Sequence, residues 1–494
     1  MRGNSEAEFV VSLNNVTLRV RERKLMPGTN WTIRPGEQWA VLGPNGSGKS
    51  TLARTIAGDL PSASGYVRIG EGNRIALVSF ERQQALYSSE TEMDLARGFS
   101  GSFDNQLTTR HLIGDAPEAG YPAMLREAIR YFDFTALIDR PFRHLSAGEM
   151  RKALVLQALA GSPTLLLLDE PFDGLDESSR AALAGHFRLL MHSGVHLVLV
   201  THRADELIEG ITHLLVIRDG TVVAAGPAAE VARSGEALFA RTAPPAARRP
   251  SRVLPLPEVS AAVGDLLVDF RGVTVDFDGR RVLDDLHWQL RRGEHWGVFG
   301  PNGSGKTTIL NLIVGRNLQA YAQDVRVFGN RRGRGDTLWD LRRRTGIVSP
   351  IIQLEYAKRV AVQDVVLSGF DGSVGLYRRP TSGETASAGR TLALLGITHL
   401  ATRPLAQLSY GQQRLVLIAR AMVKQPELLL LDEPCQGLDP ENRERVIGAI
   451  DEICLTAEVS LIYVSHHFDE YPSSLTHSLT LDGAGRAHPA RLQP

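Results

Sequence analysis

The sequence predicts an α/β fold that occurs twice along the chain. Apolar runs such as residues 165–168 and 197–200 alternate with stretches long enough for helices, a pattern typical of a parallel sheet covered by helices. A nine-residue glycine-rich motif follows one such run at residue 43, and nearly the same motif follows another at residue 300. At 494 residues, the chain has room for two domains of ordinary size.

Composition is that of a soluble globular protein, with 43% hydrophobic and 22% charged residues. The 55 basic and 55 acidic residues cancel, which excludes a global field that would attract a polyanion such as DNA. Cys435 and Cys454 fit neither a disulfide framework nor a zinc site. Without a secretory signal or an apolar run long enough to span a bilayer, the chain is expected to be cytoplasmic, and any membrane pore would come from another chain.

The two halves carry the same landmarks in the same order, at separations of 257 to 264 residues. The landmark pairs are Lys49 with Lys306, Asp169 with Asp432, and His202 with His466. Such a long period indicates a duplicated domain rather than a solenoid array, whose repeats typically span about 20 to 50 residues.

A segment rich in proline and arginine separates the halves and interrupts any periodic apolar pattern. We therefore predict a first domain at residues 1–240, a linker at 241–262 and a second domain at 263–494. The linker is expected to be short, extended and fairly stiff.

The glycine-rich motif follows the pattern G-x-x-x-x-G-K-[ST] at residues 43–50 and 300–307, each time between a strand-like and a helix-like run, as a P-loop requires. Its glycines let backbone N–H groups surround phosphates, its lysine meets the terminal phosphates, and its hydroxyl can ligate Mg²⁺. The predicted nucleotide-binding residues are Gly43, Asn45, Gly46, Ser47, Gly48, Lys49, Ser50 and Thr51, and Gly300, Asn302, Gly303, Ser304, Gly305, Lys306, Thr307 and Thr308.

Two carboxylates end a second apolar run in each half, as Asp169-Glu170 and Asp432-Glu433. The aspartate can hold Mg²⁺ through water, and the glutamate can polarise an attacking water. The predicted catalytic carboxylates are Glu170 and Glu433. The predicted metal-site residues are Ser50, Asp169, Thr307 and Asp432.

In both halves, the order of P-loop, "LSAGE" or "LSYGQ", "LLLLDEP", "GLD" and a strand-terminal histidine resembles the ATP-binding cassette ATPases. This resemblance implies two tandem P-loop NTPase domains of the ATP-binding cassette type, with ATP and Mg²⁺ as cofactors. It further implies three residue sets: signature residues at the γ-phosphate (Ser146, Gly148, Ser409, Gly411), site-coupling aspartates (Asp176, Asp439) and catalytic switch histidines (His202, His466).

The same resemblance implies why the motif occurs twice. In this family the signature of one domain completes the P-loop site of the other, so paired domains on one chain form both sites internally. One site would join the P-loop at Lys49 to Ser409 and Gly411. The other would join the P-loop at Lys306 to Ser146 and Gly148.

Two departures from the family pattern leave alternatives open. Phe80 and Pro350 stand where the family usually has glutamine; Gln83 and Gln353 follow three residues later, either as substitutes or as surface residues.

An aromatic residue is also expected before each P-loop to stack on adenine. Phe277 fits this role in the second half, with core packing as the alternative, and the first half has no aromatic residue there. This difference favours looser adenine binding at the site of Lys49.

Strings such as "FGNRRGRGDTLWDLRRRTGIVS" and "YVSHHFDE" further resemble a twin-cassette subfamily named for molybdate transport. This implies an energising subunit for import of molybdate or a related oxyanion, peripheral on the cytoplasmic face of the inner membrane beside a membrane-embedded transporter subunit. A regulatory ATPase switched by ATP, or a ribosome- or RNA-associated ATPase, remains an alternative. The Arg-rich residues 331–344 are interpreted as a solvated face rather than a phosphate contact, and no motif predicts sequence-specific nucleic-acid binding.

Overall fold

A computed structural model describes residues 9–20, 23–79, 107–115, 118–142, 145, 147–234, 253–255, 266–277, 280–334, 337–349, 352, 356, 360–466, 471–483 and 485–492. The chain divides into two compact units, Met1–Ala243 and Pro244–Pro494. Most of the predicted linker 241–262 lies outside the described residues. Within it, Val253–Pro255 forms a short strand that pairs with the last strand of the second unit.

The first unit has a six-stranded sheet in the order β5-β6-β7-β3-β8-β9 and a three-stranded antiparallel sheet in the order β2-β1-β4. Neighbouring strands from β5 to β8 are parallel, and β9 runs antiparallel at the edge. The strands are β1 (Val11–Val20), β2 (Arg23–Ile33), β3 (Trp39–Leu42), β4 (Ser64–Ile69), β5 (Ile75–Ser79), β6 (Leu165–Asp169), β7 (His196–Thr201), β8 (His213–Arg218) and β9 (Thr221–Pro227).

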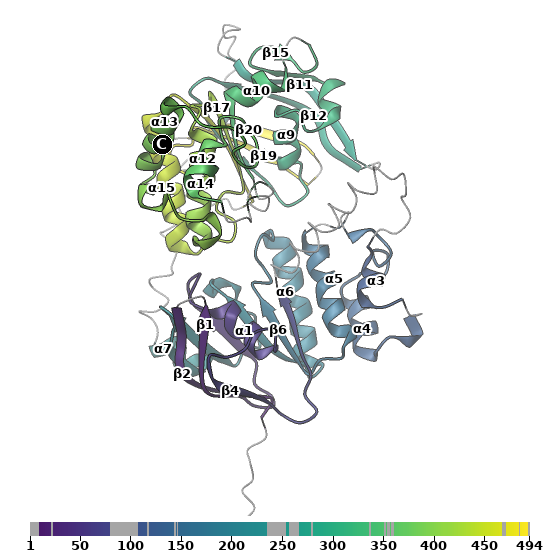
Figure 1. Ribbon diagram of the computed structural model, residues 1–494. Coiled ribbons are helices and arrows are strands. Elements are labelled where there is room, and N and C mark those ends of the chain that lie inside the picture. The colour runs from purple at the N-terminus through teal and green to yellow at the C-terminus, as the bar shows by residue number, and fades with distance from the viewer. Residues whose placement is uncertain are drawn as a thin grey trace, which may run out of the picture. The chain divides into compact units, whose positions relative to one another are not determined.

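Helices accompany these strands in the first unit (Figure 1). They are α1 (Lys49–Ile56), α3 (Thr109–Ile113), α4 (Ala123–Tyr131), α5 (Ala147–Ala160), α6 (Glu177–His192) and α7 (Ala228–Ser234). Strand β6 is buried on both faces because its leucines alternate between two cores. Leu165 and Leu167 pack with α1 and the small sheet, whereas Leu166 and Leu168 pack with α4, α5 and α6. The continuous apolar run read from the sequence is therefore that of a central parallel strand.

The second unit repeats this plan with one more strand in its main sheet, ordered β10-β20-β19-β13-β18-β17-β16, beside a sheet ordered β12-β11-β14-β15. Its strands are β10 (Val253–Pro255), β11 (Leu266–Phe277), β12 (Arg280–Arg291), β13 (His295–Phe299), β14 (Asp324–Val327), β15 (Asn330–Arg331), β16 (Thr345–Val348), β17 (Leu428–Asp432), β18 (Ser460–Ser465), β19 (His477–Leu481) and β20 (Ala487–Leu492).

The helices of the second unit are α9 (Lys306–Ile313), α10 (Leu338–Arg344), α12 (Val362–Leu367), α13 (Ser382–Leu394), α14 (Tyr410–Met422) and α15 (Pro440–Thr456). Leu428 and Leu430 of β17 join one core, and Leu429 and Leu431 join the other. The same alternation in both units confirms the predicted α/β class with two tandem domains.

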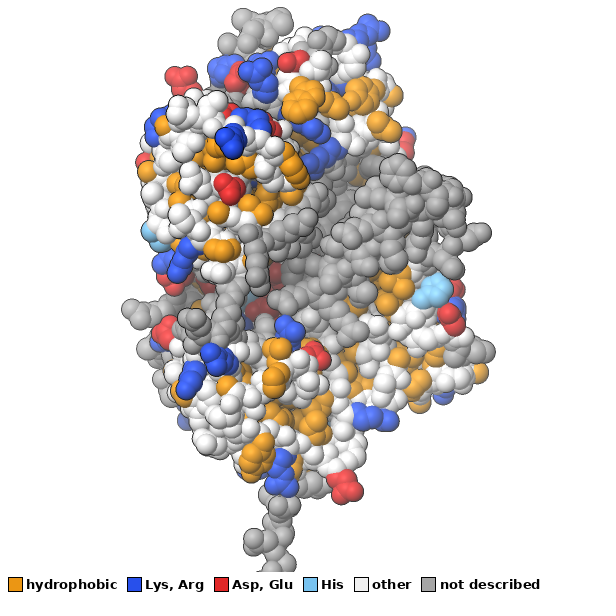
Figure 2. All heavy atoms as spheres, in the orientation of Figure 1, with side chains coloured by type: hydrophobic (Ala, Val, Ile, Leu, Met, Phe, Trp, Pro, Cys, Tyr) orange, Lys and Arg blue, Asp and Glu red, His pale blue; other side chains and the backbone are white. Residues whose placement is uncertain are grey.

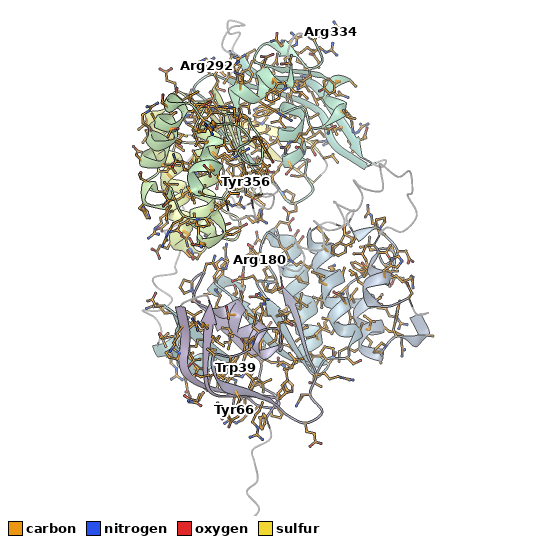
Figure 3. All side chains as sticks on the ribbon, in the orientation of Figure 1. Trp39, Tyr66, Arg180, Arg292, Arg334 and Tyr356 are labelled. Carbon is orange, nitrogen blue, oxygen red and sulfur yellow. The ribbon has the colours of Figure 1, made fainter. Side chains whose placement is uncertain are left out.

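An aromatic arrangement anchors the strand before each P-loop. In the first unit Trp39 (Figure 3) meets Trp31 edge to face at 5.2 Å and stacks on His213 at 4.8 Å. In the second unit Trp296 makes the same two contacts, at 5.5 Å and 4.7 Å, with Trp288 and His477. The duplication therefore extends from the P-loops to the aromatic packing around the strands that precede them.

Charged groups are distributed rather than gathered on the one face of the molecule that Figure 2 shows. On the face shown in Figure 2, basic and acidic side chains are scattered among uncharged ones in each unit, as the balanced composition predicts. No helix in the described part of the chain is long and apolar enough to cross a membrane.

Candidate nucleotide-binding sites

The first P-loop occupies residues 43–48, between β3 and α1. Gly43 has to be glycine because an added Cβ would lie 2.3 Å from the carbonyl oxygen of Ile217. Gly48 adopts a left-handed backbone with φ of 102° at the start of α1, a conformation that glycine reaches without strain. These two positions explain why the loop turns so tightly against the sheet.

The loop leaves the start of α1 suited to an anion. Gly48 supplies no side-chain cap to this helix, so the first helical amides can donate to phosphate oxygens. Lys49 is 4% exposed, and its Nζ donates to the carbonyl oxygens of Gly43 at 2.8 Å and Pro44 at 3.1 Å. The loop carbonyls thus hold the ammonium group beside the helix terminus.

The second P-loop repeats this geometry between β13 and α9. Gly305 starts the helix with φ of 99° and again provides no side-chain cap. Lys306 Nζ donates to Gly300 O at 2.7 Å and to Pro301 O at 2.9 Å. Both predicted loops therefore have the amide and ammonium donors that bind nucleotide phosphates.

A hydroxyl meets a carboxylate beside each P-loop. Ser50 Oγ donates to Asp169 Oδ1 at 3.0 Å, and Thr307 Oγ1 lies 3.3 and 3.4 Å from the two carboxylate oxygens of Asp432. Such oxygen donors fit Mg²⁺ that is bound jointly by protein and nucleotide phosphates. The described residues contain no cluster of three or more His, Cys, Asp or Glu side chains that could hold a metal.

The carboxylate of Asp432 is strongly perturbed. Burial, reinforced by the neighbouring charge of Glu433, raises the pKa of Asp432 to about 6, against the opposing effects of Thr307 and Lys306. A Mg²⁺ ion at this position would favour the ionised form. The perturbed pKa is therefore consistent with a site built for a cation.

In the first unit Glu170 directly follows Asp169, and its side chain lies at the end of β7. Its backbone is left-handed with φ of 50°, and its N–H donates to Val200 O at 2.9 Å. His202 Nδ1 is hydrogen bonded to Glu170 Oε2 at 2.9 Å, and Lys49 Nζ lies 3.6 Å from Glu170 Oε1. The strained turn thus places the carboxylate between the histidine and the P-loop lysine.

This arrangement keeps Glu170 ionised. Burial opposes ionisation, but His202 and then Lys49 lower the pKa of Glu170 below its ordinary value. The same contact raises the pKa of His202, although burial acts in the opposite direction. The carboxylate of Glu170 can accept a proton from a water molecule while His202 orients the carboxylate.

The second unit contains the same pair. Glu433 has φ of 48°, and its N–H donates to Val464 O at 3.0 Å. His466 Nδ1 is hydrogen bonded to Glu433 Oε1 at 2.9 Å. All these groups follow the carboxyl ends of neighbouring parallel strands, where ligands bind in open α/β sheets.

The signature of the second unit begins α14. Ser409 caps this helix, because its Oγ accepts from Gln412 N at 3.3 Å while Gln412 Oε1 accepts from Ser409 N at 3.0 Å. Gly411 packs against the start of α15, where an added Cβ would lie 2.6 Å from Asn442 Oδ1. Asn442 in turn donates to both carboxylate oxygens of Asp439 at 3.0 Å. The signature and the predicted coupling aspartate are therefore joined through one side chain.

The signature of the first unit is packed less tightly. An added Cβ at Gly148 would meet Ser179 at 3.6 Å, which is ordinary contact. Asp176 caps α6, with its Oδ1 accepting from Ser179 N at 2.8 Å. Ser146 lies outside the described residues, as do Phe80, Gln83, Pro350, Gln353 and the side chain of Phe277. The roles predicted for these residues stay predictions.

Two buried arginines near the sites were not singled out from the sequence. Arg151 is 2% exposed and donates to Asp173 O at 2.9 Å. Burial lowers the pKa of Arg151 to about 10, against the attraction of Asp173 and Glu170. Arg414 is fully buried, and its charge acts to lower the pKa of Asp432. The sequence could have indicated these arginines, because each one follows the signature serine of its own half by five residues.

Comparison with known proteins identifies the family. The family model described as "ABC transporter" matches residues 26–173 and 283–436. The chain is 39% identical to the ABC transporter ATP-binding protein ModF of Escherichia coli, over 94% of this chain and 95% of ModF. It is 27% identical to an uncharacterised ABC transporter ATP-binding protein of Schizosaccharomyces pombe, over 96% and 98% of the two chains.

Among solved structures, the chain resembles an archaeal ribosome recycling factor, aABCE1, in complex with a ribosomal stalk protein. The TM-score is 0.54 at 20% identity, over 97% of this chain and 90% of that one. This likeness shows a shared fold only. The family match, the ModF similarity and the two P-loop sites together lead to one conclusion: the chain belongs to the ABC transporter family of ATP-binding proteins, as a twin-cassette ATPase that binds and hydrolyses ATP.

Proposed function

We propose that this ATPase supplies the energy for transport of molybdate or a related oxyanion through a membrane-embedded subunit contributed by another chain. Support comes from the sequence strings shared with a twin-cassette subfamily named for molybdate transport and from 39% identity to ModF over nearly the whole chain. The two cassettes would couple ATP binding and hydrolysis to movements of that partner.

For the chemistry itself, we propose that Mg²⁺ and ATP bind at both P-loops and that Glu170 and Glu433 act as general bases. The observation that carries this assignment is the repeated carboxylate–histidine hydrogen bond of 2.9 Å in the two units. Ser50 and Asp169, with Thr307 and Asp432, would hold the metal. When bound, Mg²⁺ would neutralise charge on the phosphates.

The two units would complete each other's sites, which is the pairing that the family resemblance implies. Ser409 and Gly411 would close on ATP held by Lys49, and Ser146 and Gly148 would close on ATP held by Lys306. A signature serine at a helix start offers a hydroxyl and backbone amides to a phosphate.

The transport role is tested by fractionating cells that express a tagged chain, both as the wild type and as a Glu170→Gln, Glu433→Gln variant that holds ATP. We expect both proteins to sediment with membranes and to co-purify with a polytopic membrane protein. If an active ATPase stays in the supernatant with no such partner, the regulatory alternative replaces the transport role. Sedimentation with ribosomes would support the RNA-associated class instead.

A further inference from the structure

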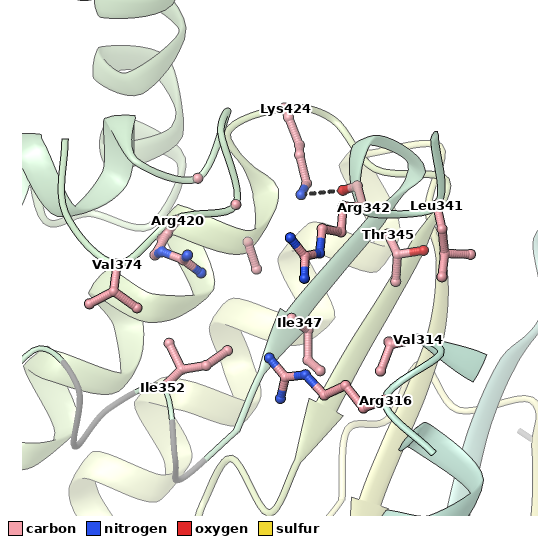
Figure 4. A pocket seen from close by; sticks show the side chains of 13 residues that line it. Val314, Arg316, Leu341, Arg342, Thr345, Ile347, Ile352, Val374, Arg420 and Lys424 are labelled. Atoms are coloured by element: carbon pink, nitrogen blue, oxygen red, sulfur yellow. Dashed lines mark hydrogen bonds between the residues drawn. The ribbon is translucent and has the colours of Figure 1, made fainter. Parts of the chain in front are cut away.

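A cavity of about 140 Å³ lies in the second unit (Figure 4), and its lining residues include none of the predicted nucleotide-binding residues. Its walls come from the turn after α9, from α10, from α14 and from the segment at residues 369–374. Since roughly 10 to 15 Å³ of such space holds one water molecule, the cavity can take several waters or one tetrahedral oxyanion. Apolar side chains such as Ile347 and Ile352 form part of the wall.

Four cationic side chains line this cavity: Arg316, Arg342, Arg420 and Lys424. In Figure 4 the three guanidinium groups are directed toward the space between them. None of the described residues that line the cavity is acidic. Four like charges around one space repel each other unless water or an anion lies between them.

Two of these cations, Arg420 on α14 and Lys424 in the turn that follows this helix, are held in place by the protein. Arg420 is 6% exposed; its Nε donates to Tyr356 Oη at 3.0 Å and its Nη2 to Ser373 O at 2.9 Å. Lys424 Nζ donates to the carbonyl oxygen of Arg342 at 2.5 Å. Preorganised donors of this kind need little reorganisation when a ligand binds.

The electrostatic cost is visible at Lys424. Burial, followed by the charges of Arg420 and Arg342, lowers the pKa of Lys424 to about 8. Among the described residues, the charged groups that act on this amine are Arg420 on α14 and Arg342 on α10, and both are positive. A bound anion would reverse this balance and favour the protonated amine.

The first unit provides an internal control, because the corresponding cavity there has a different lining. Asp59 follows its P-loop lysine by ten residues, as Arg316 does in the second unit; Gln157 and Gly161 stand at the signature spacings of Arg420 and Lys424. All three line the matching cavity. The positive charges are therefore a property of the second unit and not of the fold.

We propose that this cavity, which we call the basic pocket, binds a tetrahedral oxyanion with at least two negative charges: inorganic phosphate or the phosphoryl group of a small metabolite. Bidentate contacts from guanidinium groups suit such a ligand. This third anion site is separate from both P-loops, and the proposal does not depend on the transport role.

Isothermal titration with inorganic phosphate tests the proposal, on the full chain with both P-loops saturated by Mg²⁺ and a non-hydrolysable ATP analogue. We expect one phosphate per chain. Arg316→Asp and Lys424→Gln should each weaken binding by about 10- to 100-fold, since hydrogen bonds to charged groups are the strong class. Arg316 is exposed and the first unit carries aspartate there, so the variant is expected to fold; its melting curve verifies this.

Arg343→Ala is the matched control, because Arg343 is exposed next to Arg342 but does not line the cavity. It should leave phosphate affinity within about twofold of wild type, far from the loss expected for a charge-assisted contact. A second arm with glycerol 3-phosphate distinguishes the sources: tighter binding than phosphate indicates a phosphorylated metabolite, and weaker binding indicates the free anion.

The pH dependence adds a second readout. Because the amine of Lys424 must be protonated to hold the anion, phosphate affinity should fall as pH rises above about 8, and Lys424→Gln should flatten this fall. The proposal is overturned if Arg316→Asp and Lys424→Gln bind phosphate as wild type does. It is equally overturned if the wild-type chain does not bind phosphate.

Discussion

The two cassettes are alike at their P-loops and differ at the cavity that forms the basic pocket in the second unit. Lys49 and Lys306 are held by the same pair of loop carbonyls, at 2.8 and 3.1 Å in one unit and 2.7 and 2.9 Å in the other. The basic pocket of the second unit, in contrast, corresponds to a cavity with an aspartate and a glutamine in the first. ATP binding and hydrolysis need every donor of the P-loop, whereas the wall of a cavity outside the nucleotide-binding site can acquire another role.

The largest effect is expected from removing both bases. Glu170→Gln combined with Glu433→Gln should lower steady-state phosphate release by about 10²- to 10⁴-fold, because a positioned general base contributes that much. ATP binding should persist, since neither amide disturbs the P-loop donors. Each single variant measures how much of the phosphate release one unit contributes.

Phosphate release from the double variant within about threefold of wild type would refute the assignment of these residues as bases. Glu209→Gln is a suitable control, because this exposed residue pairs with Arg188 on the surface. It should leave turnover unchanged.

Asp432→Asn should stabilise the nucleotide-free and metal-free second unit at neutral pH. In the folded chain the pKa of Asp432 is about 6, above the ordinary value of 3.8. The protonated carboxyl of Asp432 therefore stabilises the folded unit below about pH 4, and this stabilisation is lost as the pH rises through 6. The variant avoids this loss, and its advantage should reach about 1 to 3 kcal/mol by pH 7. Melting curves between pH 4 and 8 measure it; an advantage that shrinks with rising pH would contradict the perturbed carboxylate.

The two signature glycines should respond differently to the same change. Gly411→Ala places a Cβ 2.6 Å from the tethered Asn442 and should cost about 1 to 3 kcal/mol, as overpacking does. Gly148→Ala meets only ordinary contact and should be neutral or stabilising by up to about 1 kcal/mol, because alanine is the better helix former. Thermal unfolding of the two variants compares them directly, and equal effects would contradict the described packing.

Sequence patterns predict well the features that depend on local spacing, and poorly the features that depend on contacts between distant segments. The P-loops, the Asp-Glu pairs and the strand histidines follow from spacing, because each needs neighbouring strands to end at one edge of a sheet. The left-handed backbone at Glu170 could not be predicted, since it depends on a hydrogen bond to Val200 on another strand.

The basic pocket shows the same limit more clearly. Arg316, Arg342 and Arg420 come from three separate segments, and only the folded packing of α10 and α14 brings them together. The sequence predicts a solvated face for residues 331–344. Arg342 is exposed, but Arg332 is buried, and the guanidinium group of Arg342 turns toward a cavity that no local pattern reveals.

A double-mutant cycle on ATP turnover tests most directly whether each cassette completes the site of the other. Ser409→Arg places a cation where the serine should meet ATP held by Lys49, with Ser409→Ala as the comparison that removes the hydroxyl and its helix cap without adding a charge. We predict that the Lys49→Ala, Ser409→Arg double variant turns over ATP at a rate within about twofold of the slower single variant. The reason is that the effects of two residues in one site are not additive. Lys306→Ala with Ser409→Arg should instead disable both sites and abolish turnover. If Ser409→Arg were non-additive with Lys306→Ala and additive with Lys49→Ala, each cassette would close on its own signature and the pairing would be wrong.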